Sequence, residues 1–257
     1  MPVGEEAVAT VDRAIRVLAA INEVASAEGV PVAVRHVCLA CAAAVDASGV
    51  GLYLLGDLGL CEPLYVTNPL SEQIAELQVT FGEGPGAEAL GKDHPVLVPA
   101  LGSDSSVARW PAFAPAAFAA GVSAVFAFPL VMGAISVGAL EIHRAREGGL
   151  SAAALTEVLL FADVVLPRVL DHLSGPGTAD GPDLPSSGFE YRWAEVHQAT
   201  GMVSVQLDSD LAVAFLRLRS HAYLTGRRLS LVASDVIERR LRFEPDTGNA
   251  GAAGFGG

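Results

Sequence analysis

The chain is poor in the features that mark several large classes of protein. Only 3 cysteines occur in 257 residues, too few for a disulfide framework and typical of a reducing compartment. The longest apolar stretch, near 152–166, is interrupted by Glu157 and Asp163 and is too short to span a bilayer. The sequence has no basic start followed by an apolar run, as a secretory signal would need. We therefore expect a cytoplasmic protein.

Sequence signatures of catalysis and metal binding are lacking as well. There is no GxSxG nucleophile turn, no phosphate-binding P-loop and no HExxH metal motif. Cys38 and Cys41 form a CxxC pair, but they fall in an Ala-rich predicted helix, which favours buried small residues over a redox or metal site. The 6 histidines show no metal-ligand spacing. We expect no enzyme activity, no metal and no cofactor, while an unidentified small-molecule ligand stays open.

Positive charge is scarce and gathers near the C-terminus. The whole chain has 16 basic against 29 acidic residues, a net charge of −13. Residues 1–173 hold 8 Lys and Arg against 19 Asp and Glu, whereas residues 189–243 hold 8 Arg against 6 acidic residues, a net of +2. Arginine suits bidentate contacts to phosphate and to base edges. Residues 189–243 are therefore the best candidate for the functional output, and a solvated helical face is the simpler alternative.

The composition divides the chain into four parts. Residues 174–188 consist almost entirely of Gly, Pro, Ser, Thr, Ala and Asp, and such a segment buries too little apolar area to offset the entropy of ordering it. We interpret it as a flexible linker between a domain at 1–173 and a second domain at 189–243. The Gly/Ala-rich tail at 244–257 is expected to be disordered.

The first domain alternates helical and strand patterns. Two pairs of apolar, β-leaning runs, each pair separated by a short Gly-containing segment, predict two hairpins at 49–55/60–67 and 123–131/135–143. A short strand is expected at 95–99. Helices are expected at 7–27, 32–45, 70–78, 107–120 and 151–173. Hairpins with helices at both ends indicate an antiparallel sheet in an α+β domain.

The predicted helix at 151–173 is apolar on nearly every face. Such a helix must be covered on more than one side. One side can be the sheet. The other side is expected to pack against the same helix, or the helix at 7–27, of a second copy of the chain. We therefore expect a homodimer.

The second domain predicts three helices, at 189–206, 209–224 and 230–241. Ser209 and Ser230 are expected to cap the second and third helices, and Gly226 to end the second. Small residues that let helix axes approach closely are expected to form the structural core: Ala199, Gly201, Ala222 and Ala233.

Several motifs of the first domain resemble actinobacterial GAF domains. They are Gly82-Glu83-Gly84-Pro85, Arg109-Trp110-Pro111 and Phe128-Pro129-Leu130, in this order. Many GAF members carry Cys where this chain has Gly86. The resemblance implies a sensory or dimerisation module built on an antiparallel sheet flanked by helices. It also makes Glu83 and Phe126 candidates for a ligand site, with a structural loop as the other interpretation of Glu83.

The second domain resembles the ANTAR domain, an RNA-binding output module of transcription antitermination regulators. The motifs are 198–203 (QATGMV), 216–222 (LRLRSHA) and 227–233 (RRLSLVA). Family members often have Lys where this chain has Thr200. The resemblance implies a small three-helix domain and a partner consisting of paired RNA hairpins whose loops display unpaired bases.

Within that domain, polar side chains must face outward, and the third helix offers a positive N-terminal end to phosphate. The expected RNA-contacting residues are Arg217, Arg219, His221, Arg227 and Arg228. Alternatively, these arginines form surface ion pairs with Asp235, Glu238 or Glu195. Arg239, Arg240 and Arg242 are interpreted as the basic end of a helix.

Two further functions stay open at this point. The last two helices with Gly226 between them could form a DNA-binding helix-turn-helix, although a net charge of +2 is small for tracking duplex DNA. The chain could also act as a dimeric ligand-sensing or protein-interaction module without RNA binding.

Overall fold

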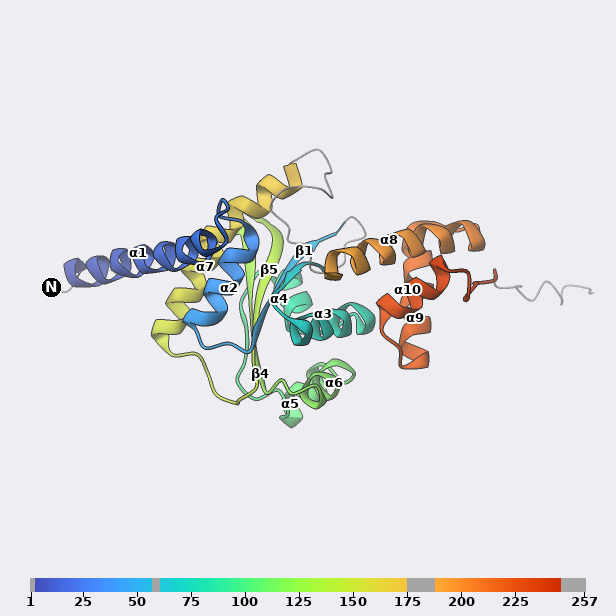
Figure 1. Ribbon diagram of the computed structural model, residues 1–257. Helices are drawn as coiled ribbons and strands as arrows, with labels where there is room; N and C mark the ends of the chain where they lie inside the picture. The colour runs from blue at the N-terminus through green and yellow to red at the C-terminus, as the bar shows by residue number, and fades with distance from the viewer. Residues whose placement is uncertain (1–2, 57–60, 175–187, 246–257) are drawn as a thin grey trace, which may run out of the picture. The chain divides into compact units, whose positions relative to one another are not determined.

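The computed structural model describes residues 3–56, 61–174 and 188–245, which form two compact units with their boundary between Glu190 and Tyr191 (Figure 1). The expected linker and most of the expected tail lie outside the described residues. Among the described residues, no helix has the length and apolar character needed to cross a membrane.

The N-terminal unit is built on one antiparallel sheet of five strands in the order β2-β1-β5-β4-β3. The strands are β1 (Gly49–Leu55), β2 (Cys61–Val66), β3 (Val96–Val98), β4 (Ala124–Met132) and β5 (Ile135–Arg144). Both predicted hairpins are present, as β1–β2 and β4–β5. The α+β prediction is confirmed, and β1 and β5 lie at the centre of the sheet.

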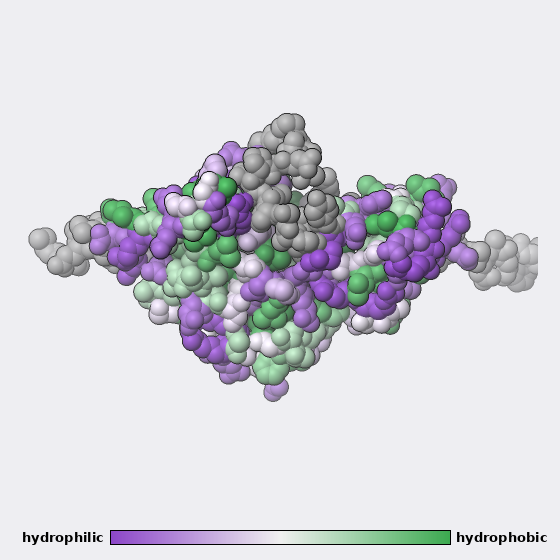
Figure 2. All heavy atoms as spheres, viewed as in Figure 1, coloured by the Kyte–Doolittle hydropathy of each residue, from purple (hydrophilic) through white to green (hydrophobic). Residues whose placement is uncertain are grey.

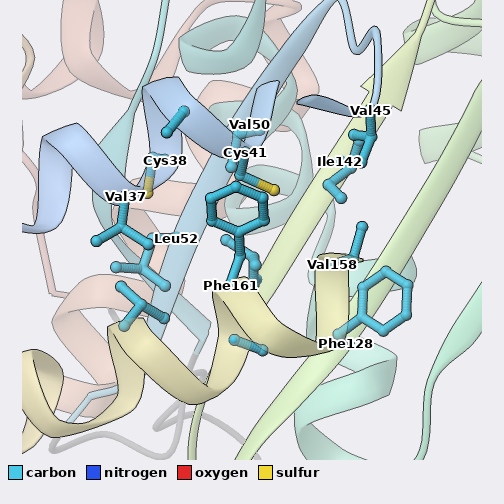
Figure 3. Packing of buried hydrophobic residues seen from close by; sticks show 14 of the residues in the cluster. Val37, Cys38, Cys41, Val45, Val50, Leu52, Phe128, Ile142, Val158 and Phe161 are labelled. Atoms are coloured by element: carbon cyan, nitrogen blue, oxygen red, sulfur yellow. The ribbon is translucent and has the colours of Figure 1, made fainter. Parts of the chain in front are cut away.

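One face of the sheet is covered by α2 (Val34–Ala44) and α7 (Ala152–Ser174), and α1 (Val3–Glu28) packs against both helices. Figure 3 shows how Val37 of α2, Leu52 of β1 and Phe161 of α7 pack together in this layer. The thiols of Cys38 and Cys41 point into the same cluster, where burial raises their pKa values. The CxxC pair is therefore apolar packing, because buried thiols are neither ionised nor reachable.

The opposite face carries α3 (Pro69–Phe81) and α4 (Pro85–Lys92), and α3 also contacts α6 (Phe113–Ala119). Two differences from the predictions arise here. The single helix expected at 107–120 is α5 (Asp104–Arg109) followed by α6, because Ser103 caps the first and Pro111 follows Trp110, which ends it. Helix α4 was not predicted, although Pro85 is at its first turn, where proline fits without losing a hydrogen bond.

The C-terminal unit contains α8 (Gly188–Leu207), α9 (Leu211–Thr225) and α10 (Leu229–Ile237). The three predicted helices are present, but both predicted serine caps are wrong. Asp210 caps α9 by accepting a hydrogen bond from Val213 N at 2.8 Å, and Arg228 holds the cap position of α10, which leaves Ser230 buried inside that helix. Gly226 ends α9 in the left-handed conformation, with φ of 62°, as expected. Helix α10 ends at Ile237 and not near 241, so Arg239, Arg240 and Arg242 follow the helix and do not form its basic end.

Candidate functional site

A buried polar cluster lies between the sheet and the layer formed by α3 and α4. Its centre is Glu141 of β5, which has no exposed surface. Tyr53 Oη donates to Glu141 Oε1 at 3.2 Å, and Gln78 Nε2 lies 3.0 Å from both carboxyl oxygens. The amide oxygen of Gln78 in turn accepts from Gly86 N at 2.9 Å. Gln78 of α3 thus links Glu141 of β5 to Gly86 in the first turn of α4.

Burial controls the charge of Glu141. Desolvation raises the pKa of this carboxyl from an ordinary 4.5 to about 7, while hydrogen bonds from Gln78, Tyr53 and Gly86 act in the opposite direction. The groups that shift this pKa include no basic side chain among the described residues. Because a buried carboxyl without a cation favours its neutral form, Glu141 is balanced between two charge states near neutral pH.

This balance predicts a pH-dependent stability. Because the pKa in the folded state is raised, the proton on Glu141 stabilises the fold fully below about pH 4.5, and that contribution is lost as the pH rises to about 7. A shift of this size corresponds to about 3 kcal/mol. Between about pH 4.5 and pH 7, we therefore expect the unfolding free energy of the wild type to fall by about 3 kcal/mol relative to that of Glu141→Gln. Urea titrations of both proteins at several pH values measure it, and a constant difference would contradict the buried-carboxyl account.

The turn between α3 and α4 brings the backbone close to the side-chain amide of Gln78. Gly82 ends α3 with φ of 68°, and Gly84 has φ of 145°, conformations that side chains with a Cβ rarely adopt. A Cβ on Gly84 would lie 2.4 Å from Gln78 Oε1. Pro85 then begins α4, and Gly86 donates its N–H to Gln78. The GEGPG sequence is therefore explained by a close approach of the backbone to the Gln78 amide.

The two residues predicted as a ligand site do not form one. Glu83 Oε1 accepts from the backbone N–H groups of Ala112 and Phe113, at 2.7 and 2.8 Å, and so caps α6, whose own cap residue has no side-chain acceptor. Phe126 is buried in the apolar layer beneath α2 and α7, on the opposite face of the sheet from Glu141. The structural interpretation of Glu83 fits these contacts, and Phe126 is a core residue.

The role of Glu83 gives a direct prediction. Glu83→Ala leaves two backbone donors at the start of α6 without their acceptor, so we expect the unfolding free energy to fall by about 2 kcal/mol. Buried Trp110 lies beside this cap and reports unfolding of the N-terminal unit when Trp193, the other tryptophan, is replaced by Phe. Glu83→Gln keeps one acceptor oxygen and is the matched control, which should lose less. Equal stability of all three proteins would exclude the capping role.

The sequence did contain a signal for Glu141 that the predictions missed. Glu141 is a charged residue between Leu140 and Ile142 in the middle of an apolar strand, so its side chain points to one buried face. Gln78 and Tyr53 carry no such signal, because each looks like an ordinary residue of a helix or a strand. Their role depends on α3 packing against β1 and β2, which brings Gln78 to Tyr53 and Glu141.

The predicted RNA-contacting residues lie along α9 and in the turn that follows it. Arg217 and Arg219 are partly buried on α9, and burial lowers the pKa of Arg219. Arg227 and Arg228 are exposed between α9 and α10. His221 is partly buried, with its ring edge-on to Phe243 at 5.5 Å between centroids, so it packs against the segment after α10. The structure thus exposes the adjacent Arg227 and Arg228 and gives His221 a packing contact.

Ion pairs occur at the same place. Arg227 Nη2 lies 2.6 Å from Asp235 Oδ2, and Arg240 Nε lies 2.7 Å from Asp235 Oδ1. Arg240 also pairs with Glu238. The ion-pair alternative therefore holds for Arg227, although its side chain keeps 41% of its surface exposed. An exposed pair of this kind does not exclude contact with a phosphate, because surface pairs contribute only about 0–1 kcal/mol.

The predicted core residues of the C-terminal unit differ in their surroundings. Ala199, Ala222 and Ala233 have no exposed surface. The expectation for Gly201 is wrong, because it is partly exposed and a Cβ there would meet nothing within 4 Å. Within the part of the chain that the structure describes, no helix therefore approaches closely at this position. Thr200 is buried, and its hydroxyl donates to Val196 O at 2.7 Å, within the same helix.

Comparisons with known proteins give structural similarity alone. No family model and no curated protein matches the sequence. Among solved structures, the chain is similar to the GAF domain of an Acinetobacter phosphoenolpyruvate-protein phosphotransferase, with 14% identity over 64% of this chain and 95% of that one, at a TM-score of 0.47. The corresponding GAF domain from Coxiella burnetii matches at 14% identity, over 63% and 96% of the two chains, with a TM-score of 0.48.

A third structure similar to the chain is a free methionine-R-sulfoxide reductase from Neisseria meningitidis in complex with its substrate. It matches at 14% identity over 61% of this chain and 90% of that one, with a TM-score of 0.42. Identity this low says nothing of ligand, activity or partner. The function of this chain has to come from its own residues and contacts.

Proposed function

We propose that the chain is a GAF–ANTAR transcription antitermination regulator, in which a sensory and dimerising N-terminal unit controls an RNA-binding C-terminal unit. The observation that carries the proposal is the set of exposed arginines at the junction of α9 and α10, in a chain that is otherwise strongly acidic. In Figure 2, hydrophilic residues cover much of the visible face of this unit. The protein acts by binding and needs no covalent chemistry.

The chemistry of the arginines supports RNA hairpins as the target. A net charge of +2 is too small for attraction alone to supply the affinity, so specificity has to come from individually placed guanidinium groups. Sequence-specific reading of RNA favours loops, whose bases can splay out and stack on side chains. Hairpins stabilised in this way prevent a terminator from folding, and transcription continues.

A second copy of the chain is the proposed partner of α1. Val11, Ile15 and Leu18 lie on one face of this helix at intervals of four and three residues and are each about half exposed or more. Val17 and Ile21, on the neighbouring face, are buried against the rest of the unit. Apolar residues break the hydrophilic surface over α1 in Figure 2. Pairing of α1 with α1 covers this face and joins two C-terminal units for two hairpins, which raises the effective concentration of the second contact.

The N-terminal unit is the proposed sensor, and Glu141 is its candidate residue. A buried carboxyl whose described neighbours are neutral donors can change charge when a ligand or a proton arrives, which is a property of a sensing group. Tyr53, Gln78 and Gly86 connect it to the α3–α4 turn, so a change at Glu141 reaches that turn directly.

Competition binding tests the proposal against both alternatives. The full-length chain is titrated against a labelled pool of RNAs that carry two short hairpins with randomised loops, at one salt concentration. Hairpin RNA should compete with the labelled pool and duplex DNA should not. Equal competition by duplex DNA would indicate a helix-turn-helix regulator. Binding of neither nucleic acid would leave a dimeric interaction module.

A further inference from the structure

We infer that Asp235 is a positioning residue that holds Arg227 and Arg240 side by side as a two-arginine site for one RNA phosphate. The inference rests on the proposed RNA-binding function and adds Arg240 and Asp235 to its machinery. The two arginines are 13 residues apart in the sequence and flank α10 at its two ends. Both meet the same carboxylate, one at each oxygen.

The backbone around Asp235 explains why Arg240 reaches this place. Arg239 adopts a left-handed conformation, with φ of 62°, which turns the chain back after α10. Arg240 N and Leu241 N then donate to the carbonyl oxygen of Asp235 at 2.8 and 3.0 Å. Asp235 therefore holds Arg240 through its main chain and its side chain together. An arrangement in which a single residue fixes both ends of an exposed arginine is more than an incidental surface pair.

The geometry of the guanidinium groups leaves donors for a ligand. Each arginine has five N–H donors. Arg227 uses Nη2 on Asp235, whereas Arg240 uses Nε on Asp235 and Nη1 on Glu238, so both keep further donors. The Asp235 side chain is 17% exposed, whereas those of Arg227 and Arg240 are 41% and 55% exposed. The carboxylate is thus largely covered and the two cations remain accessible. Anchored guanidinium groups lose less side-chain entropy when they bind a phosphate than free ones do.

Charge makes the inference testable, because positioning and simple electrostatics predict opposite signs for one substitution. Asp235→Asn removes a negative charge beside the RNA site, so electrostatic attraction alone would strengthen binding. If Asp235 positions the arginines, the same substitution weakens binding of hairpin RNA about tenfold, the loss expected for one charge-assisted hydrogen bond. Asp208→Asn is the matched control, since Asp208 is exposed, lies in the same unit and has φ of 49°, which Asn also adopts readily.

The experiment measures affinity and its salt dependence for the full-length chain and the hairpin RNA pool. Arg240→Gln should weaken binding by about the same factor as Asp235→Asn and lower the slope of log affinity against log salt by about one. Adding Asp235→Asn to Arg240→Gln should then cost little more, because the second residue acts partly through the first. A purely structural role for Asp235 would lower thermal stability without changing the salt slope.

The outcomes separate this inference from the proposed function. Wild-type binding together with undiminished binding by both Asp235→Asn and Arg240→Gln would overturn the two-arginine site and leave RNA binding intact. If Asp235→Asn fails to fold, Arg240→Gln alone decides, and an unchanged affinity and salt slope would reject the site. A wild-type chain that binds no RNA overturns the proposed function and this inference with it.

Discussion

Reversing the charge of two neighbouring arginines, Arg227→Glu with Arg228→Glu, is expected to abolish binding of hairpin RNA by the full-length chain. Both side chains are exposed between α9 and α10, next to the positive N-terminal end of α10. Each charge-assisted hydrogen bond contributes about 1.5–3 kcal/mol, so loss of two lowers the affinity about 100-fold or more before repulsion is added. Fluorescence anisotropy with labelled RNA measures the change.

The control for this variant must separate a local contact from total charge. Arg16→Glu with Arg146→Glu changes the net charge by the same amount, at two exposed arginines of the N-terminal unit. We expect it to weaken RNA binding only slightly at physiological salt, where screening acts over about 8 Å. The Arg227 pair with Asp235 is exposed, so its loss should leave the helical circular dichroism unchanged. Equal losses in both variants would indicate that only total charge matters, and unchanged affinity in the first would reject this site.

Two glutamates on the exposed face of α1 are expected to convert the dimer to a monomer. Ile15→Glu with Leu18→Glu places four carboxylates in the proposed α1–α1 interface, two from each copy. Desolvating unpaired carboxylates costs several kcal/mol, which exceeds what a pair of single helices gains from a narrow apolar stripe. Sedimentation equilibrium at micromolar concentration should show the mass of two chains for the wild type and of one chain for the variant.

Arg16→Glu alone is the matched control for that variant. It changes the charge of one chain by the same two units, on a face of α1 away from Val11, Ile15 and Leu18, where Arg16 pairs with Asp12. We expect it to stay dimeric. The Ile15→Glu, Leu18→Glu variant should also lose the preference for RNA with two hairpins, while it binds single hairpins as the wild type does. A wild-type chain that sediments as a monomer would exclude the dimer.

The parts of the fold that local patterns determine were predicted well from the sequence. The β1–β2 and β4–β5 hairpins follow from apolar runs separated by Gly-containing segments, and Gly226 ends α9 because few other residues adopt its φ. Helix α4 was missed because Gly84 and Gly86 look like turn residues. Their actual role is to let the backbone approach Gln78, which depends on a contact between α3 and α4 that no local pattern encodes.

The candidate sites were predictable only in part, for the same reason. Arginine content identified the α9–α10 region, but which arginine pairs with which carboxylate depends on the left-handed turn at Arg239. Glu83 was open to two interpretations, because a glutamate in a glycine-rich turn can bind either a ligand or backbone N–H groups. The N–H groups of Ala112 and Phe113 reach it from a segment about 30 residues away, and they favour the structural one.

Ultraviolet cross-linking of the full-length chain to RNA inside cells tests the central claim most directly. The account predicts that transcripts enriched with the wild type carry two neighbouring short hairpins ahead of a terminator, and that the Arg227→Glu, Arg228→Glu variant loses this enrichment at equal protein level. It also predicts that cross-linked peptides come from α9 and α10. Recovery of the same transcripts with the wild type and the variant, or cross-links confined to the N-terminal unit, would contradict it.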